Sequence, residues 1–405
     1  MNKEFKDLGL SEATLRALER LEYQSPTVVQ KQAIPPALEK KDLAVAAKTG
    51  TGKTAAFALP IIQNTKARKG KQPQALIITP TRELAQQIES VLVALAHTSK
   101  HRVVTFVGGV SYESQMKKLR NGVDIVVATP GRLKDMIERK AIRLDFVSIL
   151  VLDEADRMLD MGFLPAVREI VGKTPSTRQT LLFSATIDRK AMNITRNMMK
   201  DPQFIEVSHK GETADGIEQY IVPIAQNRKA ELLCAVLKER GSERVIVFAR
   251  TKSRSDMCAN QLRRAGFQAE AIHSDLSQSQ RRRALDNFKQ GKTGILVATD
   301  VLARGIDVDD VEHVINYDLP DCADDYIHRI GRTGRAGKKG DAVTFVSFDA
   351  KSNLKEIERL VGVEIPFLTV EGFDCKREAL ALRKTTPPFK NFKGSMRPRS
   401  YRGRR

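Results

Sequence analysis

Short apolar runs alternate with segments of helical period along most of this 405-residue chain. The alternation is typical of parallel α/β folds, in which a helix connects each buried strand to the next. In the first half, strands are predicted at 43–47, 75–80, 103–109, 124–130, 149–156 and 180–186. After the polar, glycine-bearing segment 208–216 the rhythm resumes with six further apolar runs. The sequence therefore predicts an α/β protein with two tandem parallel-sheet domains, over 1–207 and 217–375, and a linker over 208–216.

The chain carries 68 Lys and Arg against 49 Asp and Glu, a net charge of +19. Such an excess favours a polyanionic partner, of which nucleic acid is the most common. Residues 376–405 hold eleven of the cations and one Glu, among Pro, Gly and scattered aromatics without an apolar period. This composition predicts a disordered basic tail. We interpret the tail as an electrostatic tether for a phosphate backbone, with an inert solubilising end as the alternative.

No apolar run has the length of a membrane span, and the N-terminus lacks the apolar core of a signal peptide. The four cysteines, at 234, 258, 322 and 375, lie far apart and form no metal-binding or disulfide pattern. We therefore expect a reduced, cytoplasmic protein with no membrane partner.

The segment "AAKTGTGKT" (46–54) follows the first predicted strand and runs into a helical pattern. Its ending, Gly52-Lys53-Thr54, matches the P-loop, whose backbone N–H groups hold phosphates at a helix N-terminus. In this interpretation Lys53 reaches the β- and γ-phosphates, and the Thr54 hydroxyl binds Mg²⁺. Ala47 stands where the first glycine of the motif is usual, so the strict pattern is missed at one position.

The run "ILVLDEAD" (149–156) supplies the acid that a P-loop needs near its metal ion. Asp153 is predicted to hold the hydration shell of Mg²⁺, and Glu154 to accept a proton from the attacking water. An exposed acidic helix start is the alternative, because carboxylates favour helix N-termini. That alternative does not explain why both acids end a nearly continuous apolar strand.

The stretch "HRIGRTGRAGKKG" (328–340) sets cations at 329, 332, 335 and 338 among four glycines. A guanidinium fork fits phosphate oxygens in two-pronged geometry, and glycine lets a backbone approach an anion closely. A solvated basic loop is the alternative interpretation. Because the stretch lies between two predicted strands, it belongs to a folded domain, which favours anion binding.

Polar motifs follow strand after strand in both halves, at the carboxyl ends where open α/β sheets bind ligands. Their order and spacing resemble those of the DEAD-box ATP-dependent RNA helicases of superfamily 2, over roughly residues 1–375. The motifs are AKTGTGKT (47–54), PTRELA (80–85), a glycine pair (108–109), TPGR (129–132), DEAD (153–156), SAT (184–186), VFARTK (247–252), HSDLSQSQR (273–281), ATDVLARGID (298–307) and HRIGRTGR (328–335). With its short basic tail the chain is most similar to the compact bacterial RhlE-type members. The resemblance implies two RecA-like domains that use ATP and Mg²⁺.

By this resemblance, "YQSPTVVQ" (23–30) reads adenine: Gln30 pairs with the base edge, Phe5 stacks on the ring, and Thr27 supports the loop. Glu22 stands where a glycine is usual and Val28 where a proline is usual, yet Gln30 keeps its place, so we expect adenine preference to survive. The residues implied at the nucleotide are Phe5, Tyr23, Thr27, Gln30, Thr49, Gly50, Thr51, Gly52, Lys53, Thr54, Asp153, Glu154, Gly305, Asp307, Arg332 and Arg335. Asp307 would meet the ribose, and the catalytic members are Lys53, Glu154 and two arginine fingers, Arg332 and Arg335.

The resemblance also implies contacts with the sugar-phosphate backbone of RNA, made by small, hydroxyl and basic residues that do not read bases. These are Pro80, Thr81, Arg82, Gly108, Gly109, Thr129, Pro130, Gly131, Arg132, Arg250, Thr251, Gln278, Arg281, Thr299, Asp300 and Arg304. The residues implied to couple the nucleotide to the RNA are Ser184, Ala185, Thr186, His328 and Arg329. Lys338 and Lys339 lie past the last matched position and are interpreted as solvated charges.

The predicted function is that of an RNA-dependent ATPase that unwinds short RNA duplexes or remodels RNA–protein complexes with little sequence specificity. An ATP-gated RNA clamp or assembly scaffold, and a DNA translocase of the same superfamily, are the alternatives. Ribosome assembly, RNA decay and cold adaptation remain open as pathways. We expect the core to be monomeric.

Overall fold

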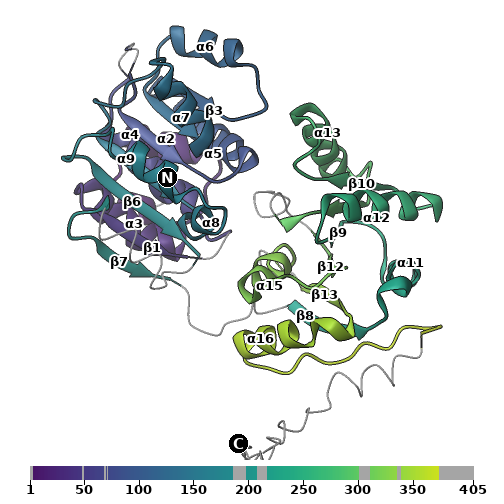
Figure 1. The fold of residues 1–405 in the computed structure, drawn as a ribbon. Coiled ribbons are helices and arrows are strands. Elements are labelled where there is room, and N and C mark those ends of the chain that lie inside the picture. Colours follow the sequence, from purple (N-terminus) through teal and green to yellow (C-terminus); the bar gives the residue numbers. More distant parts are fainter. Residues whose placement is uncertain are drawn as a thin grey trace, which may run out of the picture.

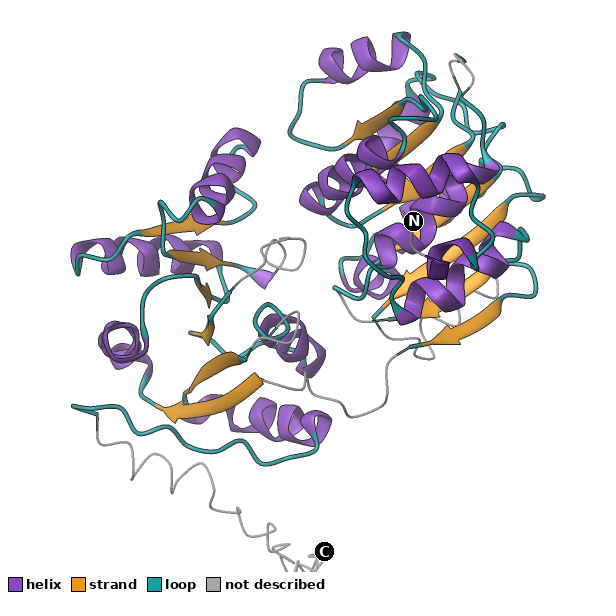
Figure 2. Ribbon diagram, turned by 180° about the vertical axis from the view of Figure 1, so that it is seen from behind, coloured by secondary structure: helices purple, strands orange, loops and turns teal. Residues whose placement is uncertain are grey.

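The structure is a computed structural model that describes residues 3–47, 50–67, 70, 72–185, 198–207, 217–300, 311–334 and 339–373. Within these residues, two parallel sheets form two separate lobes (Figure 1). The reverse view shows helices packed around each sheet (Figure 2). The predicted α/β architecture of two RecA-like domains is confirmed. The predicted linker and the predicted basic tail lie outside the described residues.

The first sheet has the strand order β3-β4-β2-β5-β6-β1-β7, and every neighbouring pair is parallel. Its strands are β1 (Leu43–Ala46), β2 (Ala75–Ile78), β3 (Val103–Phe106), β4 (Ile125–Ala128), β5 (Ile149–Asp153), β6 (Gln179–Ser184) and β7 (Gln203–Glu206). Its helices are α1 (Lys3–Lys6), α2 (Glu12–Arg20), α3 (Val28–Leu38), α4 (Lys53–Asn64), α5 (Arg82–Leu95), α6 (Tyr112–Arg120), α7 (Pro130–Glu138), α8 (Ala155–Asp160) and α9 (Leu164–Val171).

The second sheet has the order β10-β11-β9-β12-β13-β8 and is also parallel throughout. Its strands are β8 (Ile217–Pro223), β9 (Val245–Phe248), β10 (Ala269–Ile272), β11 (Ile295–Ala298), β12 (His313–Asn316) and β13 (Gly340–Val346). Its helices are α11 (Lys229–Arg240), α12 (Lys252–Arg264), α13 (Gln278–Lys289), α15 (Ala323–Ile330) and α16 (Lys351–Val361), with short 3₁₀ turns at Gln226–Arg228 and Phe348–Ala350.

The central strands are buried on both faces, which is why they appear in the sequence as continuous apolar runs. In β5, Val151 joins the cluster that contains residues of α3, α4 and α5. Its neighbour Leu150 joins the cluster on the other face, which contains residues of α7 and α9. Alternation of side chains along a strand therefore builds two cores from one sheet.

One strand of the first sheet was not predicted, and several predicted strands are too long. The unpredicted strand β7 pairs only with β1, and three of its four residues are exposed. An exposed edge strand needs no apolar run, so the sequence carries no signal for it. The run predicted at 103–109 ends as a strand at Phe106, and the run predicted at 124–130 ends at Ala128. The first strand ends two residues before the glycine pair at 108–109, and the second ends directly before TPGR (129–132).

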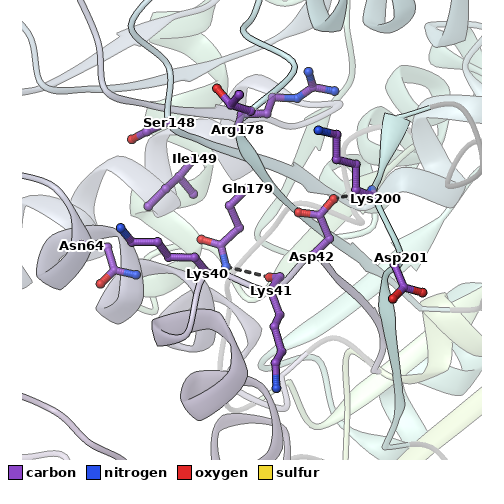
Figure 3. Close-up of a pocket in the computed structure, with 11 residues that line it drawn as sticks. Lys40, Lys41, Asp42, Asn64, Ser148, Ile149, Arg178, Gln179, Lys200 and Asp201 are labelled. Atoms are coloured by element: carbon purple, nitrogen blue, oxygen red, sulfur yellow. Dashed lines mark hydrogen bonds between the residues drawn. The ribbon is translucent and has the colours of Figure 1, made fainter.

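A cavity of about 450 Å³ opens at the amino-terminal edge of the first sheet (Figure 3). It is lined where β1, β5 and β6 begin, by residues that include Asp42, Ile149 and Gln179. The Asp42 carboxylate accepts N–H bonds from Thr180 and Lys200, both at 2.7 Å. The Gln179 amide donates to the carbonyls of Ala37 and Lys41. The polar motifs follow the carboxyl ends of the strands, so this cavity lies at the opposite end of the sheet from them.

Candidate functional site

The phosphate loop connects β1 to α4, and glycines shape its turn. Gly50 and Gly52 both have left-handed backbones, with φ of 86° and 87°. A larger residue is excluded at Gly52 for two reasons. Its backbone is left-handed, and an added Cβ would collide with the side-chain amide of Gln30. Lys53 begins α4 and is buried, 8% exposed. Thr49 lies outside the described residues, so its predicted contact stays a prediction.

Gln30 joins the segment expected to read adenine to the phosphate loop. Thr27 caps α3, and the cap is reciprocal: Thr27 accepts from the Gln30 N–H, and Gln30 Oε1 accepts from the Thr27 N–H at 3.0 Å. Gln30 Nε2 donates to the Gly52 carbonyl at 3.1 Å. The two segments are 22 residues apart in the chain and are held as one unit.

The two departures from the family pattern fit the observed backbone. Glu22 has a φ of 57°, the left-handed conformation that a glycine adopts without strain. The turn therefore keeps the usual shape at a cost of about 1–2 kcal/mol. Val28 begins α3 and is 58% exposed, in a first-turn position where many residue types are tolerated.

Phe5 packs inside the first domain. It is 1% exposed and belongs to the core cluster of α3, α4 and α5. Its ring lies edge-on to Tyr23 at a centroid distance of 6.4 Å. The described contacts give Phe5 a packing role, and stacking on a base stays a prediction.

Asp153 ends β5 as a buried carboxyl, 3% exposed. Burial raises its pKa to about 7; the neighbouring Glu154 also raises it, while Lys53 opposes the shift. A carboxylate and the Thr54 hydroxyl are hard oxygen donors of the kind that Mg²⁺ takes in small number alongside substrate phosphates. In the described part of the chain, His, Cys, Asp and Glu form no group of three that could hold a metal by themselves. With one carboxylate and one hydroxyl as donors, these residues fit an Mg²⁺ ion that takes its other ligands from nucleotide phosphates and water.

Glu154 is held in a strained backbone conformation at the start of α8. Its φ of 51° and ψ of 53° are left-handed, which is rare for a residue with a side chain. Its Oε2 is buried and has no hydrogen-bond partner among the described residues. Burial raises the pKa of this carboxyl, whereas Arg157, Lys53 and Arg332 lower it. Strain, burial and an open acceptor are together typical of a residue selected for chemistry.

The DEAD and SAT segments are bonded directly. The Asp156 N–H donates to Ser184 Oγ at 3.3 Å, and the Ala185 N–H donates to Asp156 Oδ2 at 3.0 Å. Any shift of β6 at Ser184 therefore reaches the helix that follows Glu154. This geometry suits the coupling role expected for Ser184 and Ala185, while Thr186 lies outside the described residues.

Arg329 and Arg332 of the basic stretch are buried, whereas Lys339 is exposed, as expected of a solvated charge. Arg329 is 1% exposed, and its guanidinium donates to both oxygens of Asp300, at 2.5 and 2.7 Å, and to the carbonyl of Asp318 at 2.6 Å. Arg332 is 3% exposed, with Nε donating to the His328 carbonyl at 3.3 Å. Its positive charge lowers the pKa of Glu154, a residue of the first domain.

Some predicted residues cannot be placed, and one has a partner that was not predicted. Arg304, Gly305, Asp307 and Arg335 lie outside the described residues. Asp300, predicted among the RNA contacts, directs its carboxylate to Arg329. The pair joins the end of β11 to α15, and a contact of Asp300 with RNA stays a prediction.

The other residues predicted at RNA cluster at helix N-termini in both domains. Thr81 caps α5, Thr251 caps α12, and Thr129 precedes α7, whose first residues are Pro130, Gly131 and Arg132. Helix N-termini favour anions because their backbone N–H groups point outward. The Arg82 guanidinium lies against Gly108 and Gly109, where a Cβ on Gly109 would collide with it. Of the other predicted residues, Pro80 precedes α5 and Thr299 follows β11. The Arg250 N–H donates to the Asp318 carboxylate at 3.1 Å.

Gln278 and Arg281 contact α5 of the first domain, and their contacts with RNA stay predictions. Arg281 forms an ion pair with Glu83 of α5, and both side chains are 4% exposed. Gln278 Nε2 lies 3.4 Å from the side-chain oxygens of Glu83 and Gln86. Sequence reasoning missed Glu83, although a charged residue inside the PTREL motif was an available signal.

Two further residues were missed, Asp318 and Arg157. The Asp318 carboxylate is 1% exposed and accepts from Lys229 at 3.0 Å and Arg254 at 2.8 Å, as well as from the Arg250 N–H. The lone acid that follows the run "HVINY" was its signal. Arg157 Nη2 donates to the Asp300 carbonyl at 3.0 Å, across the two domains. No local pattern could have indicated that contact.

Comparison with known proteins identifies relatives over nearly the whole folded part. The family model described as DEAD/DEAH box helicase matches residues 27–194, and the helicase conserved C-terminal domain matches residues 228–337. The DEAD-box ATP-dependent RNA helicase CshA of Geobacillus kaustophilus is 43% identical over 355 residues, 88% of this chain and 76% of that protein. The ATP-dependent RNA helicase CshA of Limosilactobacillus reuteri is 44% identical over 361 residues, 89% of this chain and 72% of its own.

Solved structures share the two-domain fold. Dbp5 of S. cerevisiae bound to RNA and ADP BeF3 superimposes with a TM-score of 0.84 at 30% identity, covering 94% of this chain and 98% of its own. Mss116p bound to ssRNA and AMP-PNP gives 0.80 at 33% identity, with coverages of 94% and 81%. A DEAD box protein from Methanococcus jannaschii is 41% identical but gives only 0.52, over 90% of this chain and 99% of its own. No helix in the described part of this chain is both long enough and apolar enough to span a membrane.

Proposed function

Because the chain belongs to the DEAD/DEAH box helicase family, we propose that it is an RNA-dependent ATPase that opens short RNA duplexes or remodels RNA–protein complexes. One observation carries this proposal: Arg157, three residues after Glu154, donates to the Asp300 carbonyl of the second domain at 3.0 Å, so the segment of the predicted catalytic acid contacts the second domain. We infer an ATP site that draws residues from both domains. Such a site is complete only when the domains are together. RNA that contacts both domains would hold them so.

The residues supply charge neutralisation and proton transfer. In phosphoryl transfer, catalysis rests on positioning and on stabilising charge that develops on the phosphoryl oxygens. Lys53 and the N–H groups at the start of α4 serve this purpose from the first domain, and Arg332 with Arg335 from the second. Glu154, whose pKa is raised by burial, is the group placed to take the proton of the attacking water. Asp153 and Thr54 would hold Mg²⁺, which adds positive charge beside the phosphates when bound.

The RNA contacts proposed here involve the backbone and not the bases. Thr81, Thr129 and Thr251 stand at helix N-termini that favour phosphate, in both domains. Arg82, Arg132 and Arg250 add cations beside them. Such contacts position a strand without reading its sequence, so binding is expected to be largely sequence-independent.

The arrangement of the domains favours the RNA- and nucleotide-bound state of the family. Two relatives bound to RNA and an ATP-like ligand give TM-scores of 0.84 and 0.80 at 30% and 33% identity. The relative that is 41% identical gives 0.52 over 90% of the chain. Higher identity with a lower score is what a different placement of two conserved domains produces. The contacts between Glu83 and Arg281 and between Arg157 and Asp300 belong to this closed placement.

We also propose that the two domains span residues 1–207 and 217–375 and that a basic tail at 376–405 tethers RNA. The described cysteines are free thiols, as in proteins of the reducing cytoplasm. We propose work there in ribosome assembly or RNA decay, as a protein of RhlE type with a monomeric core.

One assay tests the function: ATP turnover measured without nucleic acid, with mixed RNA and with DNA of the same sequence. ATP turnover should rise with RNA and not with DNA. Stimulation by DNA alone would favour a translocase, and no stimulation would overturn the proposal. A strand-displacement assay on a short RNA duplex then separates a helicase from an ATP-gated clamp, because a clamp would hold the RNA without releasing a strand.

A further inference from the structure

The helix that follows the catalytic acid reaches into the second domain. Arg157 lies one turn after Glu154 in α8 and is 5% exposed. Its Nη2 donates to the backbone carbonyl of Asp300 at 3.0 Å, although the two residues are 143 positions apart. The chain does not connect the two domains at this point, so the bond depends on how the domains are placed. It can form only in the closed placement.

The residue that receives this bond anchors the basic stretch of the second domain. The Asp300 carboxylate holds Arg329 through two hydrogen bonds, at 2.5 and 2.7 Å. Arg329 lies in the last turn of α15, and Arg332 follows it by three residues. A single residue, Asp300, thus bonds to Arg157 through its backbone and to Arg329 through its side chain. The Arg332 N–H donates to the Arg329 carbonyl at 3.1 Å, so the position of Arg332 depends on the Asp300–Arg329 pair.

The same short helix is tied to the first domain on its other side. Asp156, the residue before Arg157, bonds to Ser184 Oγ and to the Ala185 N–H. Neighbouring residues of α8 therefore contact the SAT segment and the second domain. A charged donor on a neutral carbonyl makes one of the stronger hydrogen bonds in proteins, and burial protects it from water.

We propose that Arg157 is a positioning residue for the ATPase reaction: its bond to the Asp300 carbonyl ties closure of the domains to the placement of Arg329 and Arg332 in the second domain. Arg157 does not touch the nucleotide in this role. It acts through Asp300 and Arg329. The inference rests on the proposed function, since it concerns the RNA-driven closure of the same site.

The test measures the coupling between nucleotide and RNA. RNA affinity of the full chain is determined with and without AMP-PNP, and the ratio of the two affinities reports how strongly one ligand favours binding of the other. Arg157→Met should lower this ratio by about 10- to 100-fold, the size expected when a charged hydrogen bond is lost. Its affinity for AMP-PNP alone and for RNA alone should match the wild type. Arg157→Lys, which keeps a charged donor, should retain part of the ratio.

Arg168→Met is the matched control, because Arg168 is an exposed arginine of α9 in the same domain. It should leave the ratio unchanged. An Arg157→Met protein with the wild-type ratio would overturn the inference. So would a loss of affinity for either ligand alone, which would mean that Arg157 only supports the first domain. If the wild type itself shows no coupling, the proposed function fails, a result distinct from failure of the variant.

Discussion

Gln30 and Gly52 are joined by a hydrogen bond from the side-chain amide nitrogen to the backbone carbonyl, 3.1 Å long. The amide oxygen of Gln30 accepts from the Thr27 N–H at 3.0 Å. A glutamine amide has two N–H donors and an oxygen with two lone pairs. One donor and one lone pair therefore remain, which match the N7 acceptor and the N6 donor of adenine. The bond that fixes the phosphate loop also orients the group that would read the base.

Gln30→Glu should abolish adenine preference. Glutamate has no N–H, so it loses the bond to Gly52 and the donor to the base, and its charge repels phosphates. We expect ATP affinity to fall by about 10- to 100-fold, the effect of losing two hydrogen bonds of about 1 kcal/mol each plus repulsion. Titration of ATP and GTP binding measures it. Gln63→Glu, on the same domain but bonded to Ser11 and Gly9, is the control. Equal ATP affinity in the Gln30 variant would remove Gln30 from base reading.

Glu154→Gln should stop turnover while leaving the ligands bound. The amide keeps the size of the side chain but cannot take a proton, so the rate should fall by about 10²–10⁴-fold. Binding of ATP and RNA, measured directly, should remain within a few-fold. Glu169→Gln, an exposed glutamate of α9 paired with Lys134, serves as the control. Turnover that survives in the Glu154 variant would show that another group accepts the proton.

Because of Asp153, the free energy of unfolding should fall as the pH rises. Its pKa is raised to about 7 in the folded protein, from a usual 3.8. The unfolded chain therefore loses this proton near pH 4, whereas the folded protein keeps it until about pH 7. Above the unfolded pKa, stability from this group is progressively lost, and the loss is complete above the folded pKa. Urea unfolding at pH 5 and pH 8 should show a larger drop for the nucleotide-free wild type than for Asp153→Asn. Equal drops would contradict the raised pKa.

Mg²⁺-ATP affinity should follow the opposite trend, because a metal ion binds the ionised carboxylate. We expect affinity to rise from pH 6 to pH 8 and to level off above the pKa of about 7. Calorimetry in buffers of different ionisation enthalpy should detect release of a proton on binding. Asp153→Asn should flatten the profile. An unchanged profile in that variant would assign the pH dependence to another group.

Exchanging the charges of Glu83 and Arg281 should restore the contact that reversing one charge alone breaks. Both side chains are 4% exposed, and breaking a buried pair typically costs about 3–5 kcal/mol. Arg281→Glu should therefore raise the RNA concentration needed for half-maximal ATP turnover. Combining it with Glu83→Arg should restore much of the loss. If Arg281 instead bound phosphate, the exchange would restore nothing, and the interdomain assignment would be wrong.

Removal of residues 376–405 should weaken RNA binding and flatten its dependence on salt. The segment carries eleven Lys and Arg and one Glu. For single strands, each phosphate contact contributes about −0.7 to the slope of log affinity against log salt. Affinity measured between 50 and 300 mM salt should therefore give a shallower slope for the truncated chain. ATP affinity should not change. An identical slope would support the inert tail that the composition left open.

The sequence by itself determined the features that depend on neighbouring residues. Continuous apolar runs indicated strands such as β5 because a parallel strand is buried on both faces. Gly50 and Gly52 indicated the phosphate loop because its turn needs left-handed backbone. The place of Asp153 and Glu154 after β5 indicated the acids of the site, because strand ends gather at one edge of a parallel sheet.

Only the tertiary structure decided what depends on residues far apart in the chain. The contact of Gln278 with Glu83 spans 195 positions and that of Arg157 with Asp300 spans 143, and no local pattern encodes either one. The raised pKa of Asp153 has burial as its main cause, which exists only once the sheet is covered. Asp300 pairs with Arg329, 29 positions away, a contact that its motif did not indicate. Residues that are neighbours in the sequence determine the local motifs. The pKa shifts and the contacts between domains depend on which surfaces the fold brings together.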